Sequence, residues 1–518
     1  MRDWGDLPRS WALAPLGLLA EINPRALALP ETELSPVHFV PMRAVNEEFG
    51  GIDVSARKPF GEVRKGYTAF HATDILFAKI TPCMENGKMA LVPTLDDGVG
   101  FGSTEFHVLR ARTDVAPRWL AHFLSQAEFR KFARRHMTGT TGQLRVATPW
   151  LSATNLPLAP LAEQTRIVDK LEELLSDLDA GVAELKAAQK KLAQYRQSLL
   201  KAAVEGRLTE AWRAQHGEPE ESGAQLLARI LRERRSRWEA KQLAKFEAQG
   251  KAPLKGWQDK YPLPATADAT GLPSLPSGWV WASADQLTAE CSYGTSVKCS
   301  YESNGTPVLR IPNVARRELD FDDLKFANEP LHLAAPDYLD QGDVLVVRTN
   351  GSIGLVGRAA AIEAPLNGAF YFASYLLRLR AVETTVLPSW ISAFLGSSPG
   401  RAWIEKRAAS SAGQHNISLS TLLTVPIPLP PMVEQHEAIA AMRFALEVAA
   451  VSESDTATAL HQSAAQRKNI LQAAFSGHLV PQDPNDEPAS VLLARIRAER
   501  AALGATKGRR GRPARKSA

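Results

Sequence analysis

Residues 139–148 read GTTGQLRVAT, the octapeptide PLAPLAEQ begins at Pro157, and both stretches return later in the chain. Residues 410–419 read SSAGQHNISL, and PLPPMVEQ begins at Pro428. Gly142 and Gly413 are 271 residues apart, and so are Glu163 and Glu434 (413 − 142 and 434 − 163). This period is far longer than the roughly 20–50 residues of a solenoid unit. The sequence therefore predicts a duplicated module. A chain with two similar halves can bind a target with approximate two-fold symmetry.

The composition is that of a folded protein with several domains. The chain has 518 residues, of which 45% are hydrophobic and 23% charged, and this length predicts about three or four domains. There is no apolar run of about 18 residues and no signal-peptide layout at the N-terminus. Three scattered cysteines (Cys83, Cys291 and Cys299) fit neither a disulfide framework nor a zinc site. We expect a cytoplasmic protein without a metal or cofactor.

The net charge of +5 says little about partners, because the six Lys and Arg residues after position 506 account for all of it. Any footprint of a nucleic acid must therefore lie in local clusters. The tail itself contains RGRP at 510–513, which resembles the core of an AT-hook. A disordered tail that adds non-specific affinity for phosphates is the preferred interpretation.

Each half is predicted to begin with an α+β domain. In residues 1–160, short apolar runs at 75–80 and 105–109 predict strands, and residues 119–135 predict a helix. The same order returns in residues 275–431, where 344–347 and 375–377 predict strands.

Residues 161–204 follow a different period, with small or apolar side chains spaced by alternating fours and threes, the a/d seam of a coiled coil. About 40 such residues make a rod of ~60 Å. The predicted seam consists of Ile167, Leu171, Leu174, Leu178, Gly181, Leu185, Ala188, Leu192, Tyr195, Leu199 and Ala202.

A second long helix is predicted at residues 434–475, with a thinner seam. Its small side chains allow a close approach to the first rod, so we expect the two helices to pair as an intramolecular antiparallel coiled coil with a pseudo-two-fold axis. A plain helical bundle is the alternative. The seam positions are Met442, Ala445, Ala449, Ser452, Thr456, Ala459, Ser463, Ile470 and Ala473.

The predicted organisation therefore has six segments. Residues 1–160 and 275–431 are the two α+β domains, and 161–260 and 432–503 are two helical spacer regions. Residues 261–274 form a Pro/Gly-rich linker, and 504–518 form a basic disordered tail.

Motifs of catalysis are missing from the sequence. It contains no phosphate-binding loop of the form GxxxxGK[ST], no GxGxxG after a strand, and no His/Cys cluster with the spacing of metal ligands. The segment EVRK at 62–65 resembles half of a nuclease signature, but without a matching upstream Asp it indicates a charged turn. The sequence predicts a binding protein rather than an enzyme.

Each α+β domain ends with a basic helix that leads into a polar loop, and both examples occur at the repeat offset. The loops offer amides and hydroxyls that can contact bases, and the cations can neutralise phosphates. The alternative is that these cations only complement a helix C-terminus. The candidate DNA-binding residues are Arg134, Arg135, Thr138, Thr140, Thr141 and Gln143 in the first domain, and Arg407, Ser410, Ser411, Gln414, His415 and Asn416 in the second.

Further candidates follow the central strands. Arg, Lys and Asn are the side chains that read guanine and adenine edges in the major groove. The loops differ between the halves although their frames match, which predicts two different half-site sequences. These candidates are Lys79, Thr81, Asn86 and Lys88 in the first domain, and Arg348, Thr349 and Asn350 with the upstream Arg310 and Asn313 in the second.

The order of domains and helices, together with four particular stretches, resembles the specificity subunit of type I restriction–modification enzymes. The stretches are DILFAKI at 74–80, GSTEFHVLR at 102–110, TEAWR at 209–213 and LPSGW at 275–279. The resemblance covers almost the whole chain and leaves only the tail after about residue 503 unmatched.

The resemblance implies a DNA-recognition subunit without catalysis of its own. In that family each α+β domain reads one half of an asymmetric bipartite double-stranded DNA target, and the helices fix the gap and dock two modification subunits. Those subunits carry S-adenosylmethionine and methylate a flipped adenine in each half-site, while restriction subunits add ATP-driven translocation and cleavage. Two readers on one face of DNA should then lie about one helical turn, ~34–36 Å, apart.

Two other classes of function are compatible with the sequence. In the first, the chain is a stand-alone DNA methyltransferase or nuclease, which would turn over without a partner. In the second, it is a helical adaptor, which would show no sequence preference even with its modification partner present.

Overall fold

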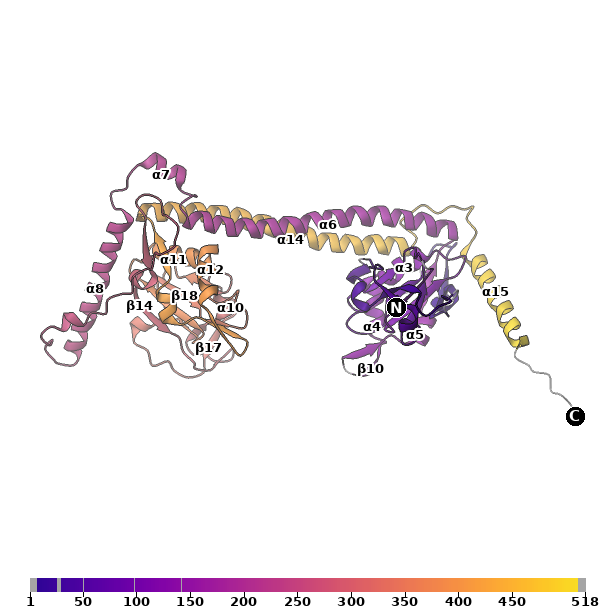
Figure 1. Cartoon of the computed structure of the whole chain (residues 1–518), viewed down its shortest axis with the longest axis horizontal. Helices are drawn as coiled ribbons and strands as arrows, with labels where there is room; N and C mark the ends of the chain where they lie inside the picture. Colours follow the sequence, from indigo (N-terminus) through magenta and orange to yellow (C-terminus); the bar gives the residue numbers. More distant parts are fainter. Residues whose placement is uncertain (1–6, 26–28, 50, 97, 141, 511–518) are drawn as a thin grey trace. The chain divides into compact units, whose positions relative to one another are not determined.

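The computed structural model describes residues 7–25, 29–49, 51–96, 98–140 and 142–510, which form two compact units (Figure 1). Unit 1 comprises residues 1–186 and 457–518, and unit 2 comprises residues 187–456. Two continuous helices of 44 residues, α6 (Leu161–Val204) and α14 (Met432–Phe475), each begin in one unit and end in the other. Both positions agree with the predicted long helices.

Unit 1 holds an α+β module built on two four-stranded sheets. One sheet has the order β2-β9-β6-β7 and the other β4-β3-β8-β5, and their strands are short and mostly antiparallel. The strands are β1 (Ala12–Pro15), β2 (Ala20–Ile22), β3 (Pro36–Val40), β4 (Arg57–Pro59), β5 (Thr68–His71), β6 (Ile75–Ala78), β7 (Met89–Leu91), β8 (Val99–Gly102), β9 (Phe106–Ala111), β10 (Thr138–Thr140), β11 (Gln143–Arg145) and β12 (Asn155–Leu158).

Helices cover the β2-β9-β6-β7 sheet of unit 1 and close its core. Trp119 of α3 (Pro117–Ser125) is fully buried and meets Trp11 edge-on, with ring centroids 5.5 Å apart. The predicted single helix at 119–135 is two helices, because Gln126 adopts an extended backbone and the Arg130 side chain donates to the freed Ser125 carbonyl at 2.6 Å. The helices are α1 (Leu16–Leu19), α2 (Phe60–Val63), α3 (Pro117–Ser125), α4 (Ala127–Arg134) and α5 (Thr148–Ala153), with 3-10 turns η1 (Met42–Ala44) and η2 (Glu47–Phe49).

Unit 2 repeats this plan with sheets ordered β14-β22-β18-β20 and β15-β17-β16-β21. Its strands are β13 (Val280–Ser283), β14 (Thr288–Tyr293), β15 (Cys299–Ser300), β16 (Pro307–Leu309), β17 (Lys325–Ala327), β18 (Asp343–Val347), β19 (Thr349–Asn350), β20 (Ala359–Ala361), β21 (Tyr371–Phe372), β22 (Leu376–Ala381), β23 (Ala409–Ser411), β24 (Gln414–Asn416) and β25 (Pro426–Leu429). Its helices are α7 (Glu210–His216), α8 (Gly223–Ala248), α9 (Ala284–Leu287), α10 (Ile311–Val314), α11 (Leu387–Gly396), α12 (Ser398–Arg407) and α13 (Leu419–Leu423), with 3-10 turns η3 (Trp257–Lys260) and η4 (Ala335–Asp337).

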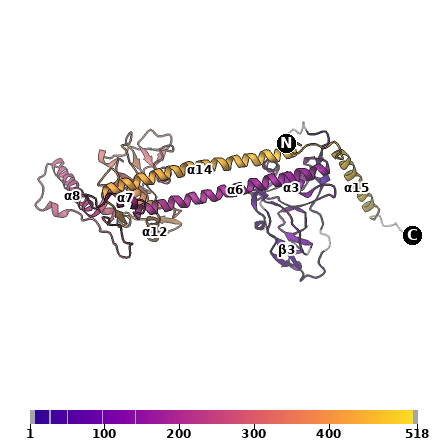
Figure 2. The same ribbon diagram turned by 90° about the horizontal axis from the view of Figure 1, so that it is seen from above.

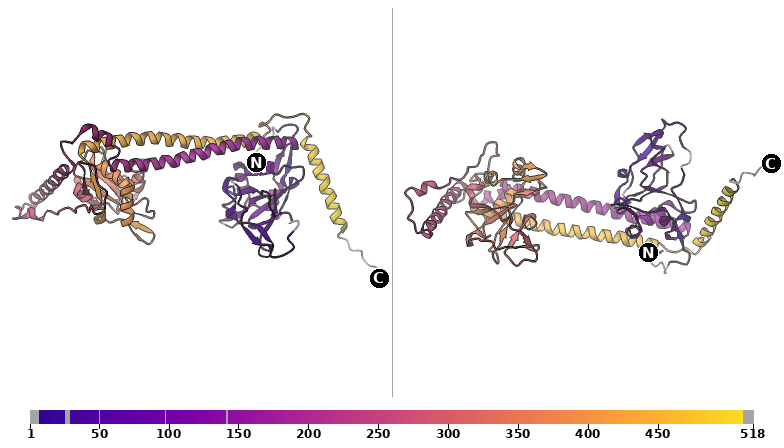
Figure 3. Two further views of the ribbon diagram at one scale, coloured as in Figure 1. Left: turned by 45° about the horizontal axis from the view of Figure 1, so that its top comes forward. Right: turned by 90° about the horizontal axis from the view of Figure 1, so that it is seen from below.

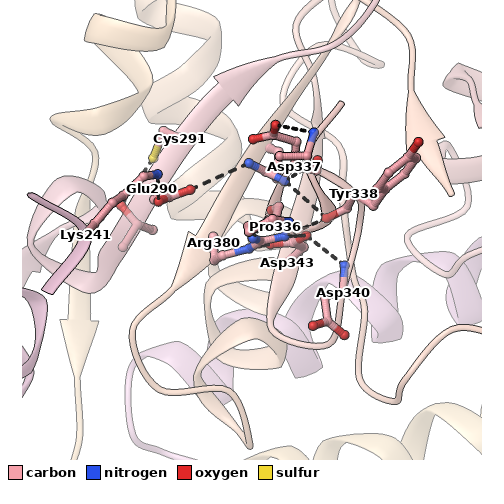
Figure 4. Close-up of polar contacts among 12 residues, drawn as sticks. Lys241, Glu290, Cys291, Pro336, Asp337, Tyr338, Asp340, Asp343 and Arg380 are labelled. Atoms are coloured by element: carbon pink, nitrogen blue, oxygen red, sulfur yellow. Dashed lines mark hydrogen bonds and ion pairs between the residues drawn. The ribbon is translucent and has the colours of Figure 1, made fainter. Parts of the chain in front are cut away.

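A buried ion pair fixes the central strand of each module. In unit 2, Arg380 of β22 donates to both oxygens of Asp343 at 2.7 and 2.8 Å, and also to the carbonyls of Pro336 and Tyr338 (Figure 4). In unit 1, Arg110 of β9 contacts Asp74 in the same bidentate way, at 2.8 and 2.6 Å. The DIL stretch begins at Asp74 and the DVL stretch at Asp343. Each therefore places a buried carboxylate at the start of a core strand.

The first and last strands of each module pair and lead directly into a long helix. β1 pairs with β12, which places Trp11 beside the start of α6, where its indole N–H donates to Glu163 at 3.0 Å. β13 pairs with β25 in the same way, and Trp279 donates to Glu434 at 2.7 Å. The glutamate of the repeated Glu-Gln dipeptide therefore joins a module to its helix.

The second oxygen of each of these glutamates binds the segment that follows the other helix. Thr209 and Arg213, which come after α6, donate to Glu434 at 2.7 and 3.0 Å in unit 2. Gln482, which comes after α14, donates to Glu163 at 2.5 Å in unit 1. Each unit therefore contains the beginning of one long helix and the end of the other.

Within each unit, the two long helices contact one another. In unit 1, Leu171 and Leu175 of α6 share a core with Leu471 and Phe475 of α14, and the two helix segments lie side by side in Figure 2. Arg467 of α14 also pairs with Asp179 of α6. In unit 2, Arg196 pairs with Glu453 at 2.8 Å.

The predicted seam of α6 is wrong at two positions. Gly181 and Tyr195 are exposed, Tyr195 to 47%, whereas the neighbouring Val182 and Arg196 face inward and are half-buried. An α-helix has 3.6 residues per turn rather than 3.5, so a strict heptad drifts around it by about 20° per repeat. Every predicted seam position of α14 is buried or half-buried.

The repeat extends further than the matched sequence motifs indicate. The segment LLARI occurs at 226–230 in α8 and again at 492–496 in α15 (Ala489–Arg510). Ile230 and Ile496 are buried, and Arg229 and Arg495 pair with Glu221 and Glu487. In Figure 3 the far end of α8 stands clear of the orange strands of unit 2 in both views.

The C-terminal helix also changes one predicted boundary. α15 continues to residue 510, so the boundary predicted at residue 504 for a disordered tail lies inside a helix. The alanines and arginines after residue 496 favour continuation of the helix. Residues 511–518 of the predicted tail lie outside the described residues.

Candidate nucleic-acid interface

An exposed hairpin, β10–β11, carries the polar loop predicted in unit 1. Thr138 pairs with Arg145 and Thr140 with Gln143, and the side chains of Thr138, Thr140 and Gln143 are exposed. Arg135 is exposed where α4 leads into the hairpin. Thr141 lies outside the described residues.

The loop after β6 is joined to this hairpin, so the structure brings the two predicted clusters together. Ile80 forms a bridge with Arg145, and the Thr81 amide donates to the Leu144 carbonyl at 3.0 Å. The Thr81 hydroxyl donates to the Gly142 carbonyl at 3.1 Å, and the amide of Val146 donates to the Lys79 carbonyl at 2.8 Å. Segments about 60 residues apart thus form one surface.

Three other predicted residues of unit 1 use their side chains for contacts with groups of the protein itself. Lys88 is half-buried and donates to the Met42 and Val45 carbonyls at 3.5 and 3.2 Å. The Asn86 amide donates to Glu47 at 2.9 Å. Arg134 pairs with Glu85, so its charge is already partly neutralised.

Unit 2 presents the corresponding hairpin with an additional strand. β19 joins β24 and β23 in a three-stranded sheet, in which Thr349 pairs with Asn416, Asn350 with His415, and Ser410 with His415 across the hairpin. The pairing of Thr349 with Asn416 matches the Ile80–Arg145 bridge of unit 1 in register. Ser410, Ser411 and Gln414 are exposed.

Aromatic rings hold two of the predicted cations of unit 2. The Arg348 guanidinium lies 4.9 Å from the centre of the Tyr293 ring, and that of Arg407 lies 4.3 Å from the Trp403 ring. Such cation–π contacts orient a guanidinium while leaving its charge available. Asn350 accepts from the Ser352 amide at 2.8 Å through its side-chain oxygen.

The two upstream candidates of unit 2 stabilise a turn instead. Asn313 is 1% exposed, and its amide donates to the carbonyls of Asp320 and Asp323 at 2.8 and 3.0 Å. Its predicted contact with a base does not fit this burial. Arg310 pairs with Asp323 at 2.9 Å and is half-buried.

Buried His107 and the half-buried pair of Arg145 and Glu105 position the hairpin of unit 1. His107 of β9 donates from Nε2 to the Val146 carbonyl at 2.8 Å, so its Nδ1 is the atom that accepts from Asn23 at 3.2 Å. Burial lowers the pKa of His107. Arg145 pairs with Glu105 at 2.8 Å, and this hydrogen bond holds the pKa of Glu105 below its ordinary value.

Sequence reasoning missed two residues of this surface. Arg145 lies in β11, and the repeat offset of 271 pairs it with the predicted Asn416, so that offset could have identified it. Tyr293 is 45% exposed beside Arg348, and its hydroxyl accepts from the Leu419 amide at 3.4 Å. Nothing in the local sequence around Tyr293 signals this position.

Membrane-spanning helices and metal clusters are both absent from the described part of the chain. No helix among those residues is both long and apolar enough to cross a membrane. The same residues contain no group of three His, Cys, Asp or Glu side chains that could hold a metal ion.

The fold is that of a duplicated protein, with one exposed hairpin per module and two long helices that each begin in one unit and end in the other. The chain is similar to specificity subunits of type I restriction enzymes, which confirms the resemblance inferred from its sequence. The Escherichia coli EcoEI and EcoAI specificity subunits are 27% and 28% identical, and each match covers 84% of this chain and 77% of the relative. The Salmonella potsdam StySPI specificity subunit is 25% identical over 97% of this chain and 98% of its own length.

A solved structure shares the fold. The match has a TM-score of 0.62 at 21% identity, and it covers 91% of this chain and 99% of the other. That structure comes from work on complex assembly and conformational transition of the type I restriction–modification system. No family model matches the chain.

Proposed function

We propose that this chain is the DNA-specificity subunit of a type I restriction–modification complex and is not itself an enzyme. Residues 1–160 and 275–431 act as target-recognition domains, each of which reads one half of an asymmetric bipartite target. The main support is the repeated surface in which the loop after a central strand pairs with an exposed hairpin, through Ile80 and Arg145 in one module and Thr349 and Asn416 in the other.

The exposed side chains of the hairpins are proposed to contact DNA. Gln143 and Gln414 occupy equivalent positions, and an amide of this kind can bind the N6 and N7 edge of adenine with two hydrogen bonds. Thr and Ser hydroxyls bind either bases or phosphates. Arg135 and Arg407, at the exposed ends of α4 and α12, are placed to neutralise phosphates.

The two long helices are proposed to form an antiparallel coiled coil along their whole length and to set the gap between half-sites. Each unit holds the start of one helix and the end of the other, which is consistent with opposite directions. An ion pair between the helices occurs in each unit, Arg467 with Asp179 and Arg196 with Glu453. Ala449, Ser452 and Thr456 of α14 face inward, and side chains of this size permit close packing.

Two methyltransferase subunits are the proposed partners, and restriction subunits are expected to join them in the cytoplasm. The outer side of α14 in unit 2 exposes Phe444, Val448 and Val451 by 71%, 54% and 62%. These residues follow a spacing of four and three, so they form one stripe on the helix. An apolar stripe of this kind on a surface helix supports docking of a protein partner.

The proposal is tested with the variants Gln143→Ala and Gln414→Ala in the complex with methyltransferase subunits. Each variant should relax the sequence preference in one half-site only, with a loss of about 1–3 kcal/mol for the base concerned. Gln462→Ala, exposed on α14, is the matched control and should change neither half. Relaxation of both halves by either variant would contradict the proposal, and turnover by the chain alone would favour a stand-alone enzyme.

A further inference from the structure

A cavity of about 620 Å³ lies in unit 2, bordered by α11, β20 and the parts of α6 and α14 that belong to this unit. Apolar side chains, among them Leu200, Ala393 and Met442, form part of its wall. Cavities of roughly 300–1,000 Å³ with an apolar wall and a few polar groups are typical of small-molecule sites. The polar groups here include four arginines, Arg196, Arg316, Arg317 and Arg443.

Three of these arginines have carboxylate partners, and Arg317 does not. Arg196 pairs with Glu453 at 2.8 Å, Arg316 with Asp320 at 3.7 Å, and Arg443 with Glu363. In the part of the chain that the structure describes, no carboxylate lies within ion-pair distance of the half-buried Arg317. A half-buried cation without a counter-ion is costly, and this cost favours the binding of an anion.

The surroundings of Arg317 increase this cost. Arg358 and Arg401 lie nearby and donate to backbone carbonyls, those of Ala315 at 2.7 Å and Ile353 at 2.9 Å respectively, and Arg401 also pairs with Glu405 at 3.0 Å. Burial, followed by repulsion from Arg358, Arg401 and Arg196, lowers the pKa of Arg317 to about 10. Arg317 therefore remains charged at neutral pH and faces other cations.

Local negative groups offset this charge only in part. Arg317 lies close to Gly396 at the C-terminus of α11, where the helix dipole supplies about half a negative charge. Glu318 and Glu447 also line the cavity, but both are exposed, and water and salt screen their charges. The backbone of Arg317 has a φ of 69°, which non-glycine residues rarely adopt, so this fold holds the side chain here at a conformational cost.

We propose that this cavity binds a phosphate-bearing small molecule of about the size of a mononucleotide, with Arg317 as its principal ligand. A guanidinium binds two phosphate oxygens through parallel N–H bonds, which suits an unpaired arginine. The apolar wall accommodates the remainder of the ligand. This binding is separate from contacts of the hairpins with DNA, and it holds or fails independently of the function proposed above.

The test is isothermal titration calorimetry of the full chain with inorganic phosphate and with adenosine 5′-monophosphate at constant ionic strength. One saturable site is expected, with tighter binding of the nucleotide. Ala450→Glu places a carboxylate in the cavity from an exposed position of α14 and should weaken binding about tenfold or more. Ala440→Glu, exposed on the same helix outside the cavity, is the control and should bind as the unchanged chain does.

A third variant tests Arg317 directly. Arg317→Met should abolish binding without lowering the melting temperature in phosphate-free buffer, because it removes a repelled cation. If this variant does not fold, the Ala450 and Ala440 pair decides the matter. The proposal is overturned by the lack of a saturable site, by equal affinity for phosphate and nucleotide, or by equal effects of the two glutamate substitutions.

Discussion

Glu434→Gln tests whether the repeated Glu-Gln dipeptide holds a module to its long helices. Glu434 is 2% exposed and accepts from Trp279, Thr209 and Arg213 at 2.7, 2.7 and 3.0 Å. The variant keeps the shape of the side chain but leaves Arg213, whose side chain is 19% exposed, without its carboxylate. Loss of one partner from a buried pair costs about 3–5 kcal/mol. We expect a loss of this size in the stability of unit 2.

The measurement is urea unfolding followed by tryptophan fluorescence, since Trp279 and Trp390 are buried in contact in unit 2 with ring centroids 5.7 Å apart. The transition of unit 2 should shift to lower urea with an unchanged slope. Glu437→Gln, exposed one turn along α14, removes the same charge and should change stability by no more than about 0.5 kcal/mol. Equal effects of the two variants, or a loss below about 1 kcal/mol for Glu434→Gln, would show that Glu434 does not hold the module in this way.

Two further predictions concern the modules themselves. Asp343→Asn should lower the free energy of unfolding of unit 2 by about 3–5 kcal/mol, because it leaves Arg380 without its bidentate partner. The control Glu233→Gln breaks an exposed i,i+4 pair with Arg237 and should lower this free energy by at most about 0.5 kcal/mol. A similar loss for both variants would contradict the argument. Burial lowers the pKa of His107 below the unfolded value of about 6.5, so neutral His107 contributes stability above that pH, and this stability is lost as the pH falls through its folded pKa. Denaturation measured from about pH 7.5 to 5 should show a loss in the free energy of unfolding that His107→Gln lacks. An identical dependence of this free energy on pH in both proteins would exclude this role.

Much of the fold could be predicted from patterns of local sequence. The period of the apolar residues predicted α6 and α14, because a helix of 44 residues repeats its signal many times. Short apolar runs predicted β6 and β18, because a strand that is buried on both faces needs apolar side chains on both of them. The repeat offset by itself aligns the two hairpins, because Gln143 and Gln414 are 271 residues apart (414 − 143).

The parts that could not be predicted depend on contacts between distant residues. Arg134 has a basic side chain beside a polar loop, yet Glu85, 49 residues away in the sequence, pairs with it and partly neutralises its charge. Asn313 is a typical reader of adenine by residue type, but the carbonyls of a turn bind it and bury it. The inward-facing residue of α6 at this point is Val182, one residue after the predicted Gly181. A count of heptads alone cannot reveal this shift.

Exchange of one module shows whether the two modules read their half-sites independently, on which the proposed function depends. Residues 1–160 are replaced by the recognition module of a relative with a different target, and methylated adenines are mapped by sequencing in cells that contain the methyltransferase subunits. We expect one half of the bipartite target to change, while the other half and the gap stay as they were. A change in both halves, or an unchanged target in an active complex, would rule out independent reading by two modules.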